Sequence, residues 1–370
     1  MIQSQNKLGR RETEVKNVAK GTLAVLLAGT AMASAGGIDR SGQSVSILFE
    51  EGTYAELSYG YVNPSVSGDD FFETPTGDLA PAYSLISGGI KSDLTDKISA
   101  ALIFDQPFGS DADYPLSSMV YSYTVAELTS SAISLVASYE VSDNIVVYGG
   151  GSYQTMAATA SLPFYGYTVD ADAASGFGYI LGAAYQIPEI ALRVALTYRS
   201  EITSEHDTSE TGPFAVVASG DATTVTTPQS LNLEFQTGVN AKTLVFGSIR
   251  WVEWSKFHLS PPDYFTGGFG SLVDYEFDRI TYNLGVGRQL TEKLSGAITV
   301  GYEETLGSDP SPLAPTDGFM SVGAGLTYAF DNFEITGGVK YLWIGDASGD
   351  AGTFTDNNAT AFGLKIAYSL

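Results

Sequence analysis

The side chains that could do chemistry in this chain are few, and the residue types that are missing exclude several kinds of catalytic and metal site. The chain has 370 residues with no Cys and two His, so it offers no thiolate nucleophile, no disulfide and no Cys- or His-rich metal site. It holds 18 Lys and Arg against 42 Asp and Glu, a formal net charge of −24. An acidic balance excludes nucleic-acid binding through a basic face. We therefore expect no metal, no cofactor and no nucleic-acid partner.

An enzyme would have to use the two histidines. Glu205-His206-Asp207 and His258 fall at the ends of the seventh and ninth strands expected below. A nucleophile or an activated water needs a base within hydrogen-bond reach. The seventh and ninth strands are not neighbours, and no G-x-S-x-G pattern occurs. The sequence therefore predicts a protein that is not an enzyme.

Basic side chains are scarce, yet several share one face of the alternating segments, while acidic residues crowd the segments between them. A ligand carboxylate would find its counter-charge on this face, and a low dielectric would strengthen the contact. The alternative is that these basic groups pair with acidic neighbours on the same face. The candidates for binding a ligand head group are Arg199, Arg250, Arg279, Lys340 and Lys365.

The elements that position these side chains are strands. Within 333–343 every second residue is apolar or Gly, and the same period of two recurs along the chain. This period predicts a strand with one apolar and one wet face. Fourteen segments show it: 53–63, 82–92, 97–105, 118–141, 145–161, 176–187, 190–206, 228–239, 243–260, 276–290, 294–306, 318–330, 333–345 and 358–370.

The connections between these segments indicate a membrane barrel. Many segments reach the roughly 9–11 residues that cross a bilayer as a tilted strand. Six short connections alternate with seven long ones, which is typical of an even-stranded outer-membrane barrel with both termini periplasmic. We predict an all-β fold, a transmembrane antiparallel β-barrel of about 14 strands over residues 53–370. It is expected to be a monomer in the bacterial outer membrane, in contact with membrane lipid and lipopolysaccharide.

The first 35 residues predict a signal peptide. A basic stretch from Lys7 to Lys20 precedes a short apolar run, and Ala33-Ser34-Ala35 supplies a cleavage pattern. The apolar run is far shorter than the ~20 residues that a spanning helix needs. Cleavage after Ala35 leaves 36–52 as a short hatch-like segment before the first strand.

Four short segments carry a resemblance to a known family. They are 198–202 (YRSEI), 228–233 (PQSLNL), 242–248 (KTLVFGS) and 251–257 (WVEWSKF), the last being the most specific. Their order resembles the FadL/TodX family of outer-membrane transporters for long-chain fatty acids and aromatic hydrocarbons. The likeness covers most of the chain after residue 35 and is densest from 190 to 345.

The resemblance implies passive import of hydrophobic small molecules. Members capture the ligand at outer loops, pass it through a lumenal pocket and release it sideways near a kink in the third strand, while an N-terminal hatch plugs the barrel. Here the kink would involve Phe104, Pro107, Phe108 and Gly109, because Pro removes a ladder donor and Gly permits a bend. An ordinary strand end is the alternative. The hatch is shorter than usual and lacks the family's Asn-Pro-Ala motif, so its role stays open.

Apolar side chains in the expected long loops are the last group of candidates. Exposed apolar patches usually bind something, although loops can also pack on one another. Candidates for ligand capture are Phe71, Phe72, Phe164, Tyr165, Phe214, Tyr264, Phe265 and Phe269. A general porin, or a structural or adhesive surface barrel, remains the alternative to a transporter of hydrophobic compounds.

Overall fold

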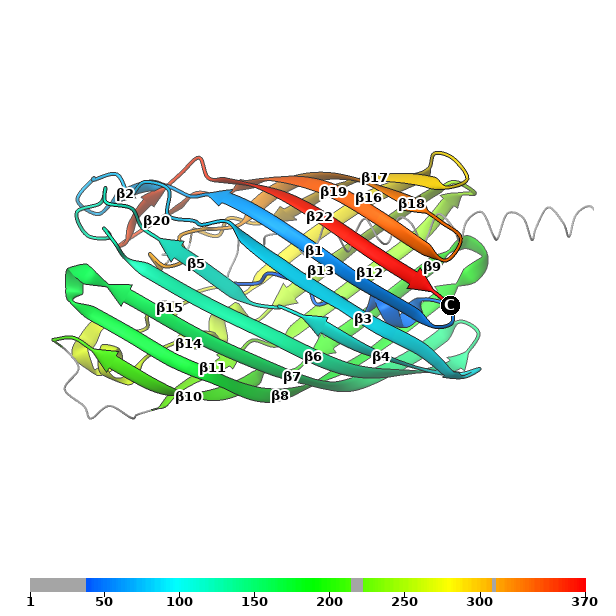
Figure 1. Ribbon diagram of the computed structural model, residues 1–370, viewed down its shortest axis with the longest axis horizontal. Coiled ribbons are helices and arrows are strands. Elements are labelled where there is room, and N and C mark those ends of the chain that lie inside the picture. Colours follow the sequence, from blue (N-terminus) through cyan, green and yellow to red (C-terminus); the bar gives the residue numbers. More distant parts are fainter. Residues whose placement is uncertain (1–37, 214–221, 308–310) are drawn as a thin grey trace, which may run out of the picture.

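The computed structural model describes residues 38–213, 222–307 and 311–370, and these form a closed antiparallel β-barrel of fourteen spans (Figure 1). The first span pairs with both the second and the last, which closes the sheet and confirms the predicted fold class. The spans are β1 (Tyr54–Ser65), β3 (Tyr83–Thr95), β4 with β5 (Ile98–Asp105, Gly109–Asp113), β6 (Val125–Ser142), β7 (Ile145–Leu162), β8 (Tyr167–Ile187), β9 with β10 (Leu192–Arg199, Ile202–Thr211), β11 with β12 (Ala222–Thr227, Ser230–Asn240), β13 (Thr243–Val252), β16 (Arg279–Gln289), β17 (Leu294–Glu303), β18 (Phe319–Ala329), β19 (Phe333–Ile344) and β22 (Asn358–Ser369).

Smaller elements lie in the connections and inside the barrel. A three-stranded sheet joins two loops, a two-stranded ribbon lies in a third, and the helical elements are single turns. They are β2 (Gly68–Asp70), β20 (Ala347–Gly349), β21 (Gly352–Phe354), β14 (His258–Leu259), β15 (Val273–Asp274), η1 (Ser46–Phe49), η2 (Pro163–Tyr165), η3 (Pro188–Ile190), η4 (Trp254–Lys256), α2 (Pro262–Tyr264) and η5 (Phe265–Phe269).

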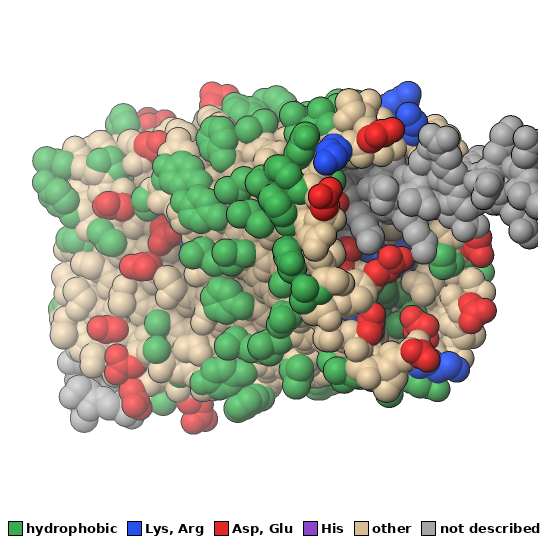
Figure 2. Space-filling view, turned by 45° about the vertical axis from the view of Figure 1, so that its right-hand side comes forward, with side chains coloured by type: hydrophobic (Ala, Val, Ile, Leu, Met, Phe, Trp, Pro, Cys, Tyr) green, Lys and Arg blue, Asp and Glu red, His purple; other side chains and the backbone are tan. Residues whose placement is uncertain are grey.

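The apolar face of the spans points outward. On β18, for example, Met320, Val322 and Leu326 are exposed whereas Ser321 and Thr327 are buried. Together the exposed apolar side chains form a band across the middle of the molecule, with acidic residues toward both ends (Figure 2). An apolar outer band around a polar interior is what a bilayer solvates favourably. Among the described residues, no helix combines the length and the hydropathy needed to cross a membrane.

The two ends of the barrel differ as the sequence predicted. The six short connections all lie at one end, which also holds the C-terminus (Figure 1). The amide of Leu370 donates to the Thr53 carbonyl at 2.9 Å there, so the chain enters and leaves the wall at the same place. The long loops lie at the opposite end, which we call the loop end.

Several strand boundaries differ from the prediction. The loop expected at 162–175 is only a turn at 163–166, because β7 and β8 stay paired up to Leu162 and Tyr167. The loop expected at 207–227 is shortened likewise by β10 and β11. In both places polar residues continue the period of two beyond the apolar band. Conversely, β6 begins only at Val125 and β13 already ends at Val252, since turns replace the expected strand residues.

The N-terminal segment lies in the lumen near the short-turn end. Val45, Ile47 and Leu48 are buried against the lumenal face of the wall, including Val136 and Tyr148. The ring of Phe49 lies under the Arg193 guanidinium, 4.5 Å from ring centroid to Cζ. The hatch-like segment is therefore a packed part of the barrel, in spite of its length. The signal peptide predicted for 1–35 lies outside the described residues.

Candidate functional site

The third span is interrupted between β4 and β5. β4 pairs with both β3 and β6, whereas β5 pairs with β6 alone. In the described part of the chain no ladder joins β5 to residues 83–87 of β3, so the wall lacks its main-chain bonds there. Pro107 fits the interruption because it has no amide to donate. The side chain of Gln106 replaces one lost bond, since its Oε1 accepts from the Ile86 amide at 2.7 Å.

The start of the N-terminal segment pairs with this interruption. Asp39 and Phe108 form an isolated antiparallel bridge. The amide of Arg40 donates to the Pro107 carbonyl at 2.7 Å, and the amide of Gly109 donates to the Ile38 carbonyl at 2.9 Å. Residues 38–40 therefore stand in for the strand that the wall is missing.

Arg40 connects the two unpaired edges. Its guanidinium pairs with Asp111 of β5 at 2.5 Å and lies 3.9 Å from the ring centroid of Tyr83 on β3. Gly109 lies against it, so a Cβ there, 2.7 Å from the guanidinium, would make the Arg40 side chain shift. The closure of the gap thus depends on a side chain of the hatch as well as on its main chain.

Two of the predicted head-group candidates hold the hatch. Arg250 pairs with Asp39 at 2.7 Å and donates to Asn232 Oδ1 at 2.8 Å and Gln43 Oε1 at 3.1 Å. Arg199 donates to the Gln43 carbonyl from Nη2 at 2.9 Å and from Nε at 3.2 Å. Both guanidinium groups are buried, and the protein itself occupies them.

The other three candidates lie apart from the hatch. Arg279 pairs with the buried Asp317 at 2.5 Å, and Lys365 pairs with Glu56 at 2.7 Å. Lys340 is only 7% exposed and makes no hydrogen bond or ion pair with any described residue. The sequence placed all five on the lumenal face but could not show which of them already have partners.

An apolar chamber adjoins the interruption on its loop side. Phe108 packs edge-on against Trp254 with ring centroids 5.7 Å apart, and Trp254 packs in the same way against Phe257 at 5.6 Å. Ile38 of the hatch belongs to the same buried cluster. The 251–257 segment, on which the family resemblance mainly rested, thus supplies the wall opposite the strand break.

The chamber is closed in this structure. Small apolar side chains of β6, β7 and β8 line it, and residues from the 253–278 loop cover it. The open volume is about 30 Å³, room for about one water molecule. A larger ligand can enter only if the covering loop moves.

Predicted capture residues from two distant loops meet in that cover. Tyr165 lies next to Phe164 at 5.2 Å and next to Phe269 at 5.7 Å, and Phe269 lies 5.2 Å from Tyr264, all between ring centroids. Phe164 and Phe265 are more than half exposed. We call Phe164, Tyr165, Tyr264, Phe265 and Phe269 the aromatic lid. Phe214 lies outside the described residues.

A single carboxylate fastens the aromatic lid to the wall. Glu210 of β10 accepts from the amides of Asp263 and Tyr264 at 2.8 and 3.0 Å and from the Tyr167 hydroxyl at 2.5 Å. Two of the three donors belong to the loop segment that carries the lid residue Tyr264, so Glu210 docks the lid on the wall beside the ring contact between Tyr264 and Tyr167 of β8, 5.0 Å between centroids.

A second exposed patch lies on the loops flanking β3 and β5. Phe71 and Phe72 are half exposed, as predicted for loop residues. Leu116, Met119 and Tyr123, in the loop between β5 and β6, are also exposed. The Met119 amide donates to Asp70, which precedes Phe71 and Phe72. Met119 and Tyr123 fall in the strand predicted for 118–141, although the turn-forming Pro-Leu-Ser-Ser at 115–118 was a usable signal, and Leu116 falls in a predicted loop but is not among the predicted capture residues.

Asp70 joins the two loops of this patch. Its carboxylate accepts from Thr74 Oγ1 at 2.5 Å, Ser118 Oγ at 2.6 Å and the Met119 amide at 3.1 Å. Burial alone would raise the pKa of Asp70, but the hydrogen bonds from Ser118 and Thr74 outweigh it and lower the pKa to about 2. The ionised form is therefore the one that holds the loops together.

We expect Asp70→Asn to loosen the patch. An unfolded Asp has a pKa of about 3.9, so the depressed folded value stabilises the loops fully above about pH 4, and this is lost as the pH falls through about 2. In the Asp70→Asn variant at pH 7, the Met119 and Val120 amides should lose about tenfold in hydrogen-exchange protection. The exposed neighbour Asp69→Asn is the matched control. Equal protection in both variants would show that Asp70 does not organise the loops.

The two histidines are not parts of one site. His206 is buried, with Nε2 2.8 Å from Ser204 Oγ and Nδ1 2.9 Å from the Asp172 carbonyl, whereas His258 is exposed on β14. Among the described residues no three His, Cys, Asp or Glu side chains are grouped so that they could hold a metal ion.

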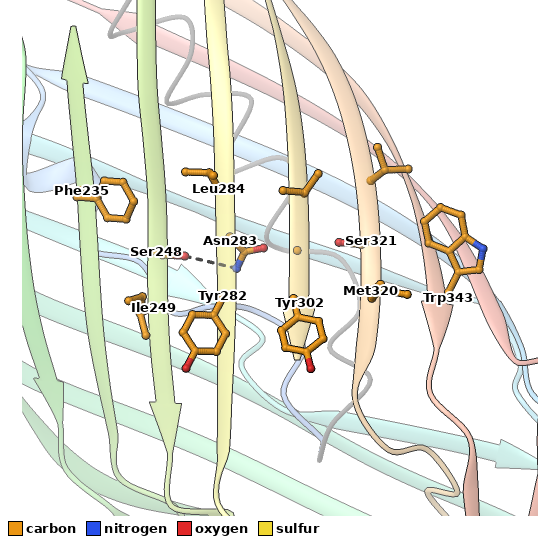
Figure 3. A pocket seen from close by; sticks show the side chains of 13 residues that line it. Phe235, Ser248, Ile249, Tyr282, Asn283, Leu284, Tyr302, Met320, Ser321 and Trp343 are labelled. Atoms are coloured by element: carbon orange, nitrogen blue, oxygen red, sulfur yellow. Dashed lines mark hydrogen bonds between the residues drawn. The ribbon is translucent and has the colours of Figure 1, made fainter. Parts of the chain in front are cut away.

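A larger groove of about 680 Å³ lies on the outer face, over β12 to β19 (Figure 3). Its sides are lipid-facing residues such as Tyr282, Tyr302 and Trp343. Membrane lipid rather than cargo is its expected content, because it lies in the apolar band. The polar residues seen there, Asn283 and Ser321, belong to the lumenal face of the same strands.

Comparison with known proteins agrees with this geometry. The chain matches the family model described as outer membrane protein transport protein (OMPP1/FadL/TodX) over residues 51–360. No curated protein sequence matches it. Among solved structures it is similar to a Pseudomonas aeruginosa FadL homologue, with a TM-score of 0.72, 15% identity, and coverage of 93% of this chain and 98% of that one. The toluene transporters TodX of Pseudomonas putida (TM-score 0.62, 11% identity, 88% and 92% coverage) and TbuX of Ralstonia pickettii (0.59, 12%, 93% and 97%) have the same fold.

Proposed function

The chain belongs to the OMPP1/FadL/TodX family of outer-membrane transport proteins, and from that premise we propose that it imports long-chain fatty acids or similar apolar compounds. Proteins of this family are transport channels and not enzymes. Uptake would be passive, since no energy-coupling element is evident in the sequence. The protein would act as a monomer in contact with outer-membrane lipid and lipopolysaccharide.

The observation that carries this proposal is the apolar chamber that ends at a break in the wall. Phe108 belongs both to the chamber cluster and to the interruption between β4 and β5. A ligand in the chamber would therefore be separated from the bilayer by residues 38–40 and not by a continuous ladder. An apolar molecule gains by leaving there, because the neighbouring phase is hydrocarbon.

The loop end would supply the entry. With both termini periplasmic, the aromatic lid and the Phe71–Phe72 patch face the outside, where they can remove apolar molecules from water. TodX and TbuX are described as toluene transporters, so an aromatic hydrocarbon is a second candidate cargo. Two packed apolar clusters lie at the loop end of the described barrel, which argues against free diffusion of polar solutes.

Uptake by whole cells tests the proposal. The chain would be expressed in a host that lacks its own channel for hydrophobic compounds, and accumulation of labelled oleate, toluene and glucose would be compared with an empty vector. We expect increased uptake of oleate or toluene and unchanged uptake of glucose. A general porin would increase glucose, and a structural or adhesive barrel would increase none of the three.

A further inference from the structure

Lys340 is the one predicted head-group candidate that the protein leaves without a partner in its described part. Arg199 and Arg250 bind the hatch, and Arg279 and Lys365 are in ion pairs. We propose that Lys340, with the hydroxyls of Thr299 and Ser321, forms a site for the carboxylate of an amphiphilic cargo molecule. This site lies on β17, β18 and β19, apart from the hatch and the strand break. The inference rests on the proposed function, because an amphiphile must first enter the lumen.

A glycine makes room between two of the three groups. Gly323 of β18 is paired with Thr299 on one side and with Lys340 on the other. A Cβ at Gly323 would lie 2.6 Å from Thr299 Oγ1 and 3.7 Å from the Lys340 Cβ. The Thr299 hydroxyl thus takes the place that a side chain at position 323 would need, and glycine lets it lie over β18 between its own strand and that of Lys340.

A second glycine repeats the arrangement one position toward the loop end. A Cβ at Gly301 would lie 2.5 Å from Ser321 Oγ and 3.0 Å from Asn283 Oδ1. Figure 3 shows Asn283 and Ser321 on the strands to either side of this position. The two hydroxyls are neighbours on the lumenal face, because Ser321 pairs with Gly301 and Thr299 pairs with Gly323 two residues along the same strands.

The polar groups beside Gly301 and Gly323 lack partners among the described residues. Ser321 is 5% exposed, and its Oγ is buried without a hydrogen bond. Thr299 Oγ1 and Lys340 Nζ likewise have none, although both residues are less than a tenth exposed. Buried polar groups are rarely left unsatisfied, so the buried Ser321 Oγ, on strands shared with two further groups that have no described partner, indicates a missing ligand or water.

The chemistry of the three groups selects an anion. The ammonium can only donate, and each hydroxyl can donate to a carboxylate oxygen. Within the described ranges no acidic side chain lies at ion-pair distance from Lys340 to compete. On the short-turn side, the neighbouring lumenal positions Ala297, Gly325 and Gly338 have almost no side chain, so no bulky group from these positions would block an alkyl chain. A carboxylate with an apolar tail fits both features.

Binding of decanoate and of methyl decanoate tests the site. Affinities would be measured by calorimetry on the purified full chain in an uncharged detergent, for the wild type, Lys340→Met, Lys340→Arg and Ser321→Ala. We expect Lys340→Met to weaken decanoate binding about tenfold to a hundredfold and to leave methyl decanoate unchanged. Lys340→Arg should retain most of the affinity. Lys293→Met, at an exposed turn, is the matched control, and heat-modifiable gel migration verifies that each barrel is folded.

Two results would overturn the site. One is decanoate binding by folded Lys340→Met within twofold of the wild type. The other is a parallel loss for methyl decanoate, which would indicate a change of shape and not of charge recognition. If wild-type protein binds methyl decanoate and decanoate but Lys340→Met changes neither affinity, only this site is refuted. If the wild type binds neither compound, the proposed function fails together with the site.

Discussion

Import should stop when residues 39 and 108 are joined by a disulfide, and a reducing agent should restore it. The natural chain has no Cys, so Asp39→Cys with Phe108→Cys gives one defined cross-link. Asp39 and Phe108 are a non-hydrogen-bonded antiparallel pair, since the bonds run between their neighbours. Such pairs have Cα atoms about 4.5 Å apart, within the range that a disulfide spans. The bond would fix the hatch across the interruption, and uptake of oleate or toluene should fall to the empty-vector level.

The controls for this experiment separate the cross-link from the substitutions. Each single Cys variant sets the uptake expected without a bond, which matters because Phe108 also packs on Trp254. A second disulfide, at Thr327 and Thr336, joins two strands that are already paired and should leave uptake unchanged. Full uptake by the oxidised 39–108 protein would mean that cargo leaves the barrel by another route.

Replacing Arg250 should release the hatch. In Arg250→Met the carboxylate of Asp39 stays buried without its counter-charge, and removing one partner of a buried pair typically costs about 3–5 kcal/mol. That is roughly a hundredfold to several-thousandfold in the balance between docked and free hatch. We expect frequent open-channel events in planar bilayers where the wild type is closed. The wall should stay folded, because its ladders do not involve this side chain.

A double variant identifies the cause of the opening. Asp39→Asn combined with Arg250→Met removes the stranded charge, so it should be closed more often than Arg250→Met alone. Arg288→Met, an exposed arginine on β16, is the control for the loss of a basic residue. Wild-type conductance in folded Arg250→Met would show that other contacts suffice to hold the hatch.

Much of the barrel wall could be predicted from sequence because each strand and each short connection is encoded by residues that are neighbours in the chain. The period of two places apolar residues toward lipid on every span, and the short connections mark one end of the barrel. Prolines and glycines carried further information, since the interruption lies where Pro107 and Gly109 suggested a bend. The predicted strand boundaries were wrong where the outward-facing residues are no longer apolar. Around Thr168 and Asp170 the alternation is inverted relative to the membrane band, with polar residues on the outer face and apolar Tyr167 and Val169 buried inside, and the acidic sequence there resembles a loop.

The interior could not be predicted in the same way, because its partners are distant in the chain. Alternation showed that Arg199 and Arg250 face inward, but not that a main-chain carbonyl of Gln43 and the carboxylate of Asp39 would meet them. No periodic signal marks residues 38–43, since their conformation is fixed by the wall around them. For the same reason the free lysine and the paired ones look alike in the sequence, and only their surroundings distinguish Lys340 from Lys365.

The position of the hatch in the chain has a consequence for the order of assembly. Its contacts with Arg250 and Asn232 join residues separated by 211 and 190 positions, so they cannot exist until β12 and β13 have been synthesised and have joined the sheet. Closing loops of that length is slow compared with forming hairpins between neighbouring strands. The first described residues to be made are thus among the last to reach their native contacts. An assembly intermediate that contains only β1 to β9 has a wall with an interruption and, as yet, no fully docked segment to seal it.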